Sequence, residues 1–170
     1  YGATVFNYCK VTGLLKDGEL VNGVVAEDQE TGETLKINSK VVINATGVFA
    51  DEVIQMDEPE KPQMITPSQG IHLILDKSFL PGDYAIMVPH TADGRVMFAV
   101  PWHNHVVVGT TDTLIDNYSL EPVALESEIE FVLETAGQYL TKKPTRKAVL
   151  SVFAGLRPLA KPEGGKKATK

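Results

Sequence analysis

Two side chains of this 170-residue sequence have the chemistry that a reaction site needs. His72 lies in the alternating segment 70–76, on the face opposite to the apolar side chains of Ile71 and Leu73. A neutral histidine accepts a proton from an alcohol near pH 7, so His72 is a candidate general base. A histidine that only covers the surface or a neighbouring strand would give the same pattern.

Arg157 lies in the motif GLRPL and is the second candidate. Pro158 restricts Arg157 to an extended backbone, and Gly155 permits a bend just before it. We expect the guanidinium to project from the end of a strand, where its fork of donors suits a carboxylate or a phosphate. An ordinary salt bridge would explain the same tripeptide equally well.

The remaining polar motifs favour structural roles. GTTD at 109–112 is expected to end a strand and to cap a turn, with the lining of a pocket as the alternative. PWHNH carries two histidines, but a metal site needs more ligands and Cys9 is far away in sequence, so metal binding receives little weight. The sequence shows no Ser-His-Asp order, no GxGxxG and no phosphate-binding P-loop.

Small residues follow an apolar run at Ala45-Thr46-Gly47. Val41, Val42 and Ile43 predict a buried strand, and a strand that ends in small residues lets another group approach its backbone closely. A tight turn from strand to loop is the plainer explanation of these three residues alone.

The composition is that of a globular protein, with 43% hydrophobic and 22% charged residues. The net charge of −6 argues against general nucleic-acid binding. One cysteine excludes an intrachain disulfide, and no apolar run is long enough to span a membrane. The sequence begins inside a strand candidate and ends in the polar segment KPEGGKKATK, so we expect a piece of a larger protein.

The periodicities predict an α+β fold: an antiparallel-rich sheet with a helix on one face, joined to a small β-meander. The meander has strands at 3–12, 18–28 and 34–43, followed by helical turns at 49–56 and a Pro-rich boundary near 56–64. The second region has strands at 70–76, 84–90, 96–102, 106–112 and 147–159, with a hairpin turn at Asp93-Gly94 and a helix at 123–140.

The helix carries apolar side chains on one face and glutamates on the other. The expected core is Ile71, Leu73, Leu75, Val106, Val108, Ile129, Leu133 and Val149.

Four motifs in order resemble one family. They are VVINATGVFADEV, ITPSQGIHLILD, AIMVPHTADGRVMFAVPWHNHVVVGTTDT and SVFAGLRPLAKP. Together they closely resemble the FAD-dependent glycerol-3-phosphate dehydrogenases, respiratory flavoenzymes of the D-amino-acid-oxidase-like group. The resemblance covers essentially the whole chain. PSQGxH, PWxxxxxxGTTDT and GLRPL are quite specific when taken together, whereas ATG alone is shared by many flavoproteins.

The resemblance implies FAD as cofactor and glycerol 3-phosphate as substrate. Ala45, Thr46 and Gly47 would lie with their backbone against FAD, and Val11 would lie near its adenine end; Phe49 stands near where the family usually has Trp. His72 would take the hydroxyl proton while the C2 hydride moves to the flavin, and Arg157 would bind the phosphate or orient the substrate. Residues 1–56 would belong to the FAD-binding domain, 57–158 to the substrate domain, and 159–170 to a return segment.

The family's dinucleotide fingerprint, its first substrate-binding arginine and its Ser-Arg segment do not occur in this sequence. We therefore expect the isolated chain to bind FAD weakly or not at all and to show no turnover. The resemblance also implies quinone as acceptor, and a cytoplasmic location or peripheral association with the inner face of a bacterial cell membrane. The alternatives are a related flavoenzyme for amino or 2-hydroxy acids, and a non-enzymatic module that binds an anion.

Overall fold

The computed structural model describes residues 2–89, 91 and 94–161. Asp93 of the predicted hairpin turn and residues 162–170 of the predicted return segment lie outside these described residues. By its internal contacts the chain divides into two compact units, residues 1–64 and 65–170, and each is described by itself. Within the described ranges, no helix is both long enough and apolar enough to cross a membrane.

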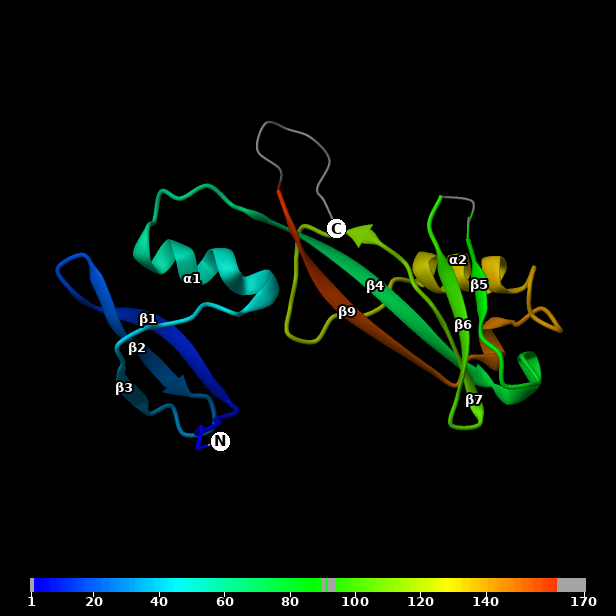
Figure 1. The fold of residues 1–170 in the computed structure, drawn as a ribbon, viewed down its shortest axis with the longest axis horizontal. Coiled ribbons are helices and arrows are strands. Elements are labelled where there is room, and N and C mark those ends of the chain that lie inside the picture. The colour runs from blue at the N-terminus through cyan, green and yellow to red at the C-terminus, as the bar shows by residue number, and fades with distance from the viewer. Residues whose placement is uncertain (1, 90, 92–93, 162–170) are drawn as a thin grey trace. The chain divides into compact units, whose positions relative to one another are not determined.

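The first unit is a three-stranded antiparallel meander followed by a short helix (Figure 1). Its strands are β1 (Cys9–Asp17), β2 (Leu20–Asp28) and β3 (Thr34–Asn38). The 3-10 turn η1 (Gly47–Phe49) leads directly into α1 (Ala50–Asp57). The meander and the helical turns that the sequence predicts are therefore present.

Several strand ends in this unit differ from the prediction, and the first strand continues to Asp17 instead of stopping at residue 12. The first strand begins at Cys9 rather than at residue 3, and the third stops at Asn38 rather than at residue 43. Val41 and Ile43 are 71% and 84% exposed, and residues 41–46 belong to no strand. The apolar run alone was not sufficient, because a strand forms only where a neighbouring strand pairs with its backbone.

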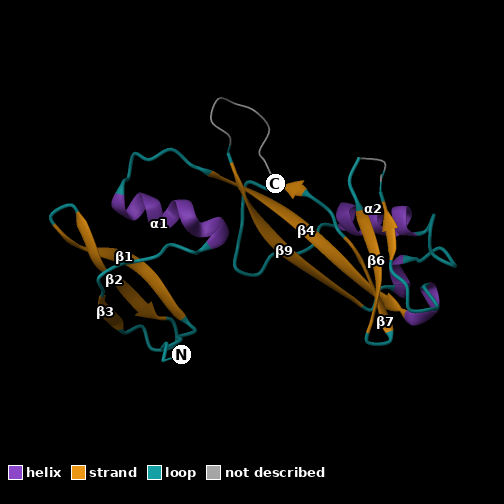
Figure 2. Ribbon diagram, in the orientation of Figure 1, coloured by secondary structure: helices purple, strands orange, loops and turns teal. Residues whose placement is uncertain are grey.

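The second unit is a six-stranded antiparallel sheet built around β4 (Ile65–Asp76), as Figure 2 shows. The order is β5-β6-β7-β4-β8, and β9 pairs with the other edge of β4. The partner strands are β5 (Ile86–Val88), β6 (Met97–Trp102), β7 (His105–Gly109), β8 (Thr113–Leu114) and β9 (Ser151–Ala160). β4 begins earlier than the predicted residue 70, because β9 pairs with it from Ile65 onward. The three-residue turns η2 (Lys77–Phe79) and η3 (Arg146–Ala148) complete the unit.

The core of this unit lies between α2 (Glu126–Ala136) and one face of the sheet. Alternation along β4 and β7 directs every second side chain to that face, which confirms the buried positions Ile71, Leu73, Leu75, Val106, Val108, Ile129 and Leu133. Val149 is only partly buried against this cluster, so its assignment to the core was wrong. Burying each large aliphatic side chain contributes about 1.5–3 kcal/mol, so this face fixes the register of the sheet.

α2 differs from the predicted helix at 123–140 in its length and in the burial of one glutamate. It begins at Glu126 and ends at Ala136, because Leu125 is extended and Gly137 follows as its C-cap. Glu130 and Glu134 are exposed as expected, but Glu128 is only 4% exposed, so the prediction that the glutamates form a solvated face was wrong at this position. A buried carboxylate needs hydrogen-bond donors, and the sheet supplies them.

Candidate active site

His72 lies on the sheet face opposite to α2, in one row of side chains across four strands. Gly109 of β7 and Phe153 of β9 are its direct neighbours in register, and Phe98 of β6 lies beyond Gly109. The imidazole stacks on the Phe153 ring, with 5.1 Å between the ring centroids and 13° between the planes. A Cβ at Gly109 would lie 2.5 Å from His72 Cδ2, so this glycine leaves the space that the ring occupies. Half-buried between β7 and β9, His72 therefore has a fixed position.

The surroundings of His72 favour its neutral form. Burial lowers its pKa below the ordinary histidine value, and the positive charge of Arg157 lowers that pKa further. A histidine with a lowered pKa is unprotonated at pH 7, so one ring nitrogen is free to accept a proton. This is the state that a general base requires before the reaction.

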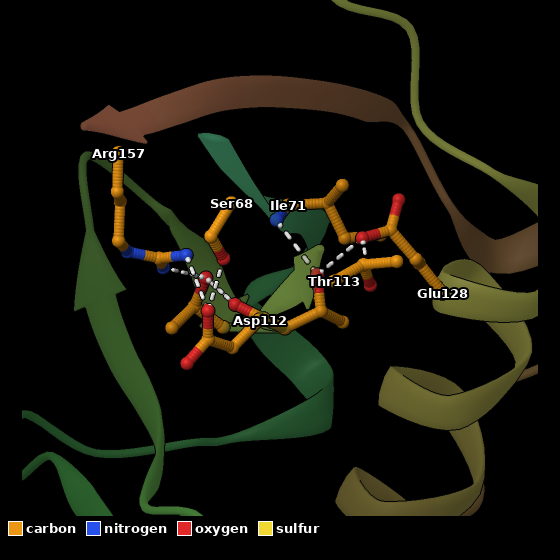
Figure 3. Close-up of polar contacts among 8 residues, drawn as sticks. Ser68, Ile71, Asp112, Thr113, Glu128 and Arg157 are labelled. Atoms are coloured by element: carbon orange, nitrogen blue, oxygen red, sulfur yellow. Dashed lines mark hydrogen bonds and ion pairs between the residues drawn. The ribbon is translucent and has the colours of Figure 1, made fainter. Parts of the chain in front are cut away.

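The Arg157 guanidinium has its protein partners in the β7–β8 connection (Figure 3). Its Nη2 donates to Thr110 Oγ1 at 2.9 Å, and its Nη1 is 3.7 Å from Asp112 Oδ1. Ser68 Oγ donates to the same Asp112 oxygen. Nη1 is buried and makes no hydrogen bond within the described residues, while the side chain as a whole remains 33% exposed. The site thus presents a partly neutralised cation with unused donor capacity.

Two local expectations around Arg157 were wrong. The residue does not end its strand, since β9 continues to Ala160, and Gly155 pairs regularly with Gly70 instead of forming a bend. Gly70 has no positive φ. A glycine is needed at position 70 because the Arg157 guanidinium occupies the space of a side chain. A Cβ at Gly70 would lie 2.5 Å from Arg157 Nη1 and 2.7 Å from Arg157 Cζ.

Replacing Gly70 by alanine is expected to displace the guanidinium and leave the sheet intact. The clashing atoms are the end of a flexible side chain, so the free energy of unfolding should change by less than about 1 kcal/mol. If Arg157 binds an anionic substrate, the apparent affinity should fall about 10-fold, the value of one charged hydrogen bond. Steady-state kinetics of the full-length protein measures the affinity, and thermal denaturation measures the stability.

Gly155→Ala is the matched control, because Gly155 is the register partner of Gly70 and a Cβ there meets nothing within 4 Å. This control should keep wild-type affinity and stability. Equal affinities in the two alanine variants would show that the position of Arg157 does not matter for binding.

The segment GTTDT joins β7 to β8, and its side chains contact groups on both sides of the sheet. β7 ends at Gly109, earlier than the predicted residue 112. Thr110 and Asp112 contact Arg157, whereas Thr111 Oγ1 and Thr113 Oγ1 each donate to Glu128 Oε1 at 2.8 Å. Alternate residues therefore serve opposite sides of the sheet, and the threonines that the sequence assigns to turn capping belong to the surroundings of the site.

Ser68 and Glu128 were missed as candidate site residues, and Thr110 and Asp112 were considered only through the alternative that GTTD lines a pocket. Their roles depend on pairing between segments far apart in the chain, which a single motif does not reveal. The one available signal was the run of four consecutive polar side chains in GTTDT, which in an extended segment must present polar groups to both faces of the sheet.

In the first unit, residues 45–47 are exposed and lead from the loop after β3 into η1, which begins at Gly47. Gly47 has φ 62°, and a Cβ added there would meet nothing within 4 Å. Asn44 holds the segment in place, since its Oδ1 accepts a hydrogen bond from Thr46 Oγ1 at 2.7 Å and its Nδ2 donates to Ala50 O at 3.0 Å. An accessible backbone with small side chains fits the close approach of a dinucleotide. Val11 is half-buried in β1, opposite Ala26.

The turn between β6 and β7 and a cavity beside Gln69 do not include His72 or Arg157. His103 and Asn104 form the tight turn between β6 and β7, both with positive φ, and the described residues contain no group of three or more potential metal ligands. A cavity of about 340 Å³ opens beside Gln69 and is lined partly by Asn117, Tyr118 and Ser119. Its lining contains no group that titrates near neutral pH.

Comparisons with known proteins agree with this architecture. The family model of FAD dependent oxidoreductases (DAO) matches residues 1–167. A mitochondrial glycerol-3-phosphate dehydrogenase of Schizosaccharomyces pombe is 39% identical over 170 residues, covering 94% of this chain and 26% of that protein. One from Arabidopsis thaliana is 41% identical over 162 residues, covering 94% of this chain and 25% of that protein.

Solved structures give the same relationship. The glycerol-3-phosphate dehydrogenase from Bacillus halodurans, complexed with FAD, has a TM-score of 0.85 and 34% identity, covering 92% of this chain and 32% of that chain. A glycine oxidase from Bacillus cereus, with a TM-score of 0.66 and 17% identity, shows the shared fold alone. The chain spans about a quarter to a third of the length of the glycerol-3-phosphate dehydrogenases that it matches. Because the family model covers nearly the whole sequence, the chain belongs to the family of FAD dependent oxidoreductases.

Proposed function

We propose that this chain is part of an enzyme that oxidises sn-glycerol 3-phosphate to dihydroxyacetone phosphate with FAD as its cofactor. The observation that carries the proposal is the presence, on one sheet face, of a half-buried histidine stacked on Phe153 and of the Arg157 guanidinium packed over Gly70. An alcohol that bears a phosphate needs both groups, one for the proton and one for the anion. The named relatives are glycerol-3-phosphate dehydrogenases over the same residues.

His72 is the proposed general base. Oxidation of the C2 alcohol removes the hydroxyl proton and a hydride from carbon, and FAD when bound supplies the acceptor for the hydride. The neutral imidazole takes the proton at a ring nitrogen as the carbonyl forms. Stacking on Phe153 and the space at Gly109 keep the ring in one orientation, so little reorganisation is required during proton transfer.

Arg157 is the proposed phosphate ligand, or a residue that orients the substrate through its phosphate. The buried Nη1 lacks a hydrogen-bond acceptor within the described residues, and an unsatisfied buried donor costs about 1–3 kcal/mol. A phosphate oxygen that draws the guanidinium outward would supply that acceptor. Asp112 partly offsets the charge of Arg157, so we propose that further cations of the whole protein complete the site for a dianion.

The first unit is proposed to contribute to FAD binding. Ala45, Thr46 and Gly47 would hold the dinucleotide through their exposed backbone, and Val11 would lie near the adenine end. In this proposal residues 1–56 belong to the FAD-binding domain, 57–158 to the substrate domain, and 159–170 return toward the FAD-binding domain. These assignments rest on the resemblance of the motifs and on the accessible backbone at Gly47.

We extend the proposal to the cellular role of the whole protein. Quinone as electron acceptor, a cytoplasmic location or peripheral association with the inner face of a bacterial cell membrane, and glycerol metabolism as the context follow from the resemblance to respiratory enzymes. Acceptor assays with the full-length protein, with quinone against oxygen, would decide the first of these.

A substrate comparison tests the proposed function. Glycerol 3-phosphate, D-amino acids and 2-hydroxy acids are mixed anaerobically with the full-length protein, and loss of flavin absorbance is recorded. Of the three substrates, we expect only glycerol 3-phosphate to bleach the flavin rapidly. The isolated 170-residue chain should bind FAD weakly or not at all and should show no turnover. Bleaching by an amino or 2-hydroxy acid would support the related oxidases, whose carboxylate suits the same arginine fork. A full-length protein without a flavin requirement would support an anion-binding module.

A further inference from the structure

Glu128 lies beneath the candidate active site, on the opposite side of the sheet from Arg157 (Figure 3). Its Oε1 accepts hydrogen bonds from Thr111 Oγ1 and Thr113 Oγ1, each at 2.8 Å. Its Oε2 accepts from Gln69 Nε2 at 2.7 Å and from the Leu125 amide at 3.0 Å. One carboxylate therefore joins α2 to β4 and to the β7–β8 connection.

These hydrogen bonds keep Glu128 charged although it is buried. Burial alone would raise its pKa, but the Leu125 amide and the side chains of Gln69, Thr113 and Thr111 together lower the pKa below the ordinary value of a glutamate. A buried carboxylate with four donors is expensive to remove and is tied closely to its partners.

The β7–β8 connection that Glu128 holds is a bulge against β4. His72 pairs with Gly109, and Gln69 pairs with Thr113. Between these two pairs β4 advances by three residues and the opposing segment by four, so the opposing segment carries one extra residue. An extra residue shifts the alternation by one position and exchanges the faces on which side chains lie.

The bulge decides what faces Arg157. Because of the shift, Thr110 and Asp112 reach Arg157, while Thr111 and Thr113 turn to Glu128. The Ile71 amide has its partner in the bulge too, donating to Thr111 Oγ1 at 3.1 Å. The Thr111 hydroxyl thus joins the β4 backbone to the Glu128 carboxylate.

We propose that Glu128 is a positioning residue for substrate binding: it holds the bulge at 110–113 in the register that directs Thr110 and Asp112 to Arg157. The inference rests on the proposed function, in which Arg157 binds the substrate phosphate. Without the carboxylate, Thr111 and Thr113 lose their common acceptor, the bulge loosens, and the guanidinium loses its fixed partners.

The test compares Glu128→Gln with Glu130→Gln in the full-length protein. Glutamine keeps the size of the side chain but replaces one acceptor oxygen by a donor, so it cannot accept all four hydrogen bonds. We expect the apparent KM for glycerol 3-phosphate to rise about 10-fold or more with a smaller change in kcat. Hydrogen exchange should become faster in residues 109–114. Glu130 is exposed on the same helix, so its variant should match the wild type in both measurements.

A double-mutant cycle with Arg157→Ala separates positioning from general damage. If Glu128 acts through Arg157, its effect on KM should largely disappear in the Arg157→Ala background, because the effects of residues in one network are not additive. If Glu128→Gln does not fold, the same contact can be tested from its other side with Thr111→Val and Thr111→Ser. The valine variant should raise KM, and the serine variant, which keeps the hydroxyl, should restore it.

Wild-type KM in Glu128→Gln, or a rise in KM that is fully additive with Arg157→Ala, would overturn the proposal. If the wild-type protein does not oxidise glycerol 3-phosphate, the proposed function itself fails. In that case, hydrogen exchange of residues 109–114 in Glu128→Gln tests separately whether Glu128 holds the bulge. Exchange at the wild-type rate would show that it does not.

Discussion

Replacing His72 by alanine in the full-length protein is expected to slow flavin reduction by glycerol 3-phosphate by about 10²–10⁴-fold. The variant lacks the group that takes the hydroxyl proton, while Arg157 and its partners are unchanged. Apparent affinity for the substrate should therefore change little. Single-turnover absorbance, recorded at several substrate concentrations, separates the limiting rate from the affinity.

His105→Ala is the control for this variant. His105 is exposed at the β6–β7 turn, with Nδ1 2.8 Å from His103 O, and should be replaceable without effect on flavin reduction. Loss of the stacking contact with Phe153 in His72→Ala should cost about 1 kcal/mol, which thermal denaturation detects. A His72→Ala protein that reduces its flavin at the wild-type rate would show that the histidine is structural.

The pH dependence of kcat/KM should differ between the wild-type protein and an Arg157→Ala variant. Burial, and secondly Arg157, lower the pKa of His72, so the base is neutral at pH 7 and kcat/KM should fall only below the ordinary histidine range near 6.5. Removing the charge of Arg157 should move this acidic limb to higher pH. Stability follows the same sign: the unfolded chain takes up the proton first, so the contribution of His72 is present above about pH 6.5 and declines as pH falls.

Local patterns were sufficient for much of the fold. The alternation of Ile71, Leu73 and Leu75 gave both the strand and its buried face, because side-chain direction along a strand depends only on the chain itself. The same alternation put His72 on the open face. The run at Val41–Ile43 failed as a strand, since pairing needs a partner that local composition does not contain.

The surroundings of the site depended on pairing across the sheet. A glycine is needed at position 70 because the guanidinium of Arg157, on another strand, occupies the space of a side chain. The buried carboxylate of Glu128 accepts hydrogen bonds from threonines that follow β7. The bulge opposite Ile71 appears only when the registers of β7 and β8 are known together. Such residues look ordinary in sequence because their contacts lie about 15 to 90 positions away along the chain.

Replacing Arg157 by alanine is expected to raise the apparent KM for glycerol 3-phosphate about 10–100-fold, the range for one or two charge-assisted hydrogen bonds. The limiting rate of flavin reduction should fall far less, since His72 keeps its position between Gly109 and Phe153. The measurement is the same single-turnover series, and Arg146→Ala is a suitable control. Arg146 forms an exposed ion pair with Glu126 at 2.8 Å, and removing such a pair should cost less than about 1 kcal/mol.

Arg157→Lys distinguishes charge from geometry. Lysine keeps the positive charge but has no planar fork, so it cannot bind Thr110 and a phosphate oxygen in parallel directions. If the fork orients the substrate, the lysine variant should recover only a small part of the lost affinity. If it recovers nearly all of it, Arg157 acts as a point charge, and the contacts with Thr110 and Asp112 serve stability instead of substrate binding. A wild-type KM in Arg157→Ala would contradict both roles, orientation by the fork and attraction by charge. The substrate phosphate would then have to bind elsewhere in the protein.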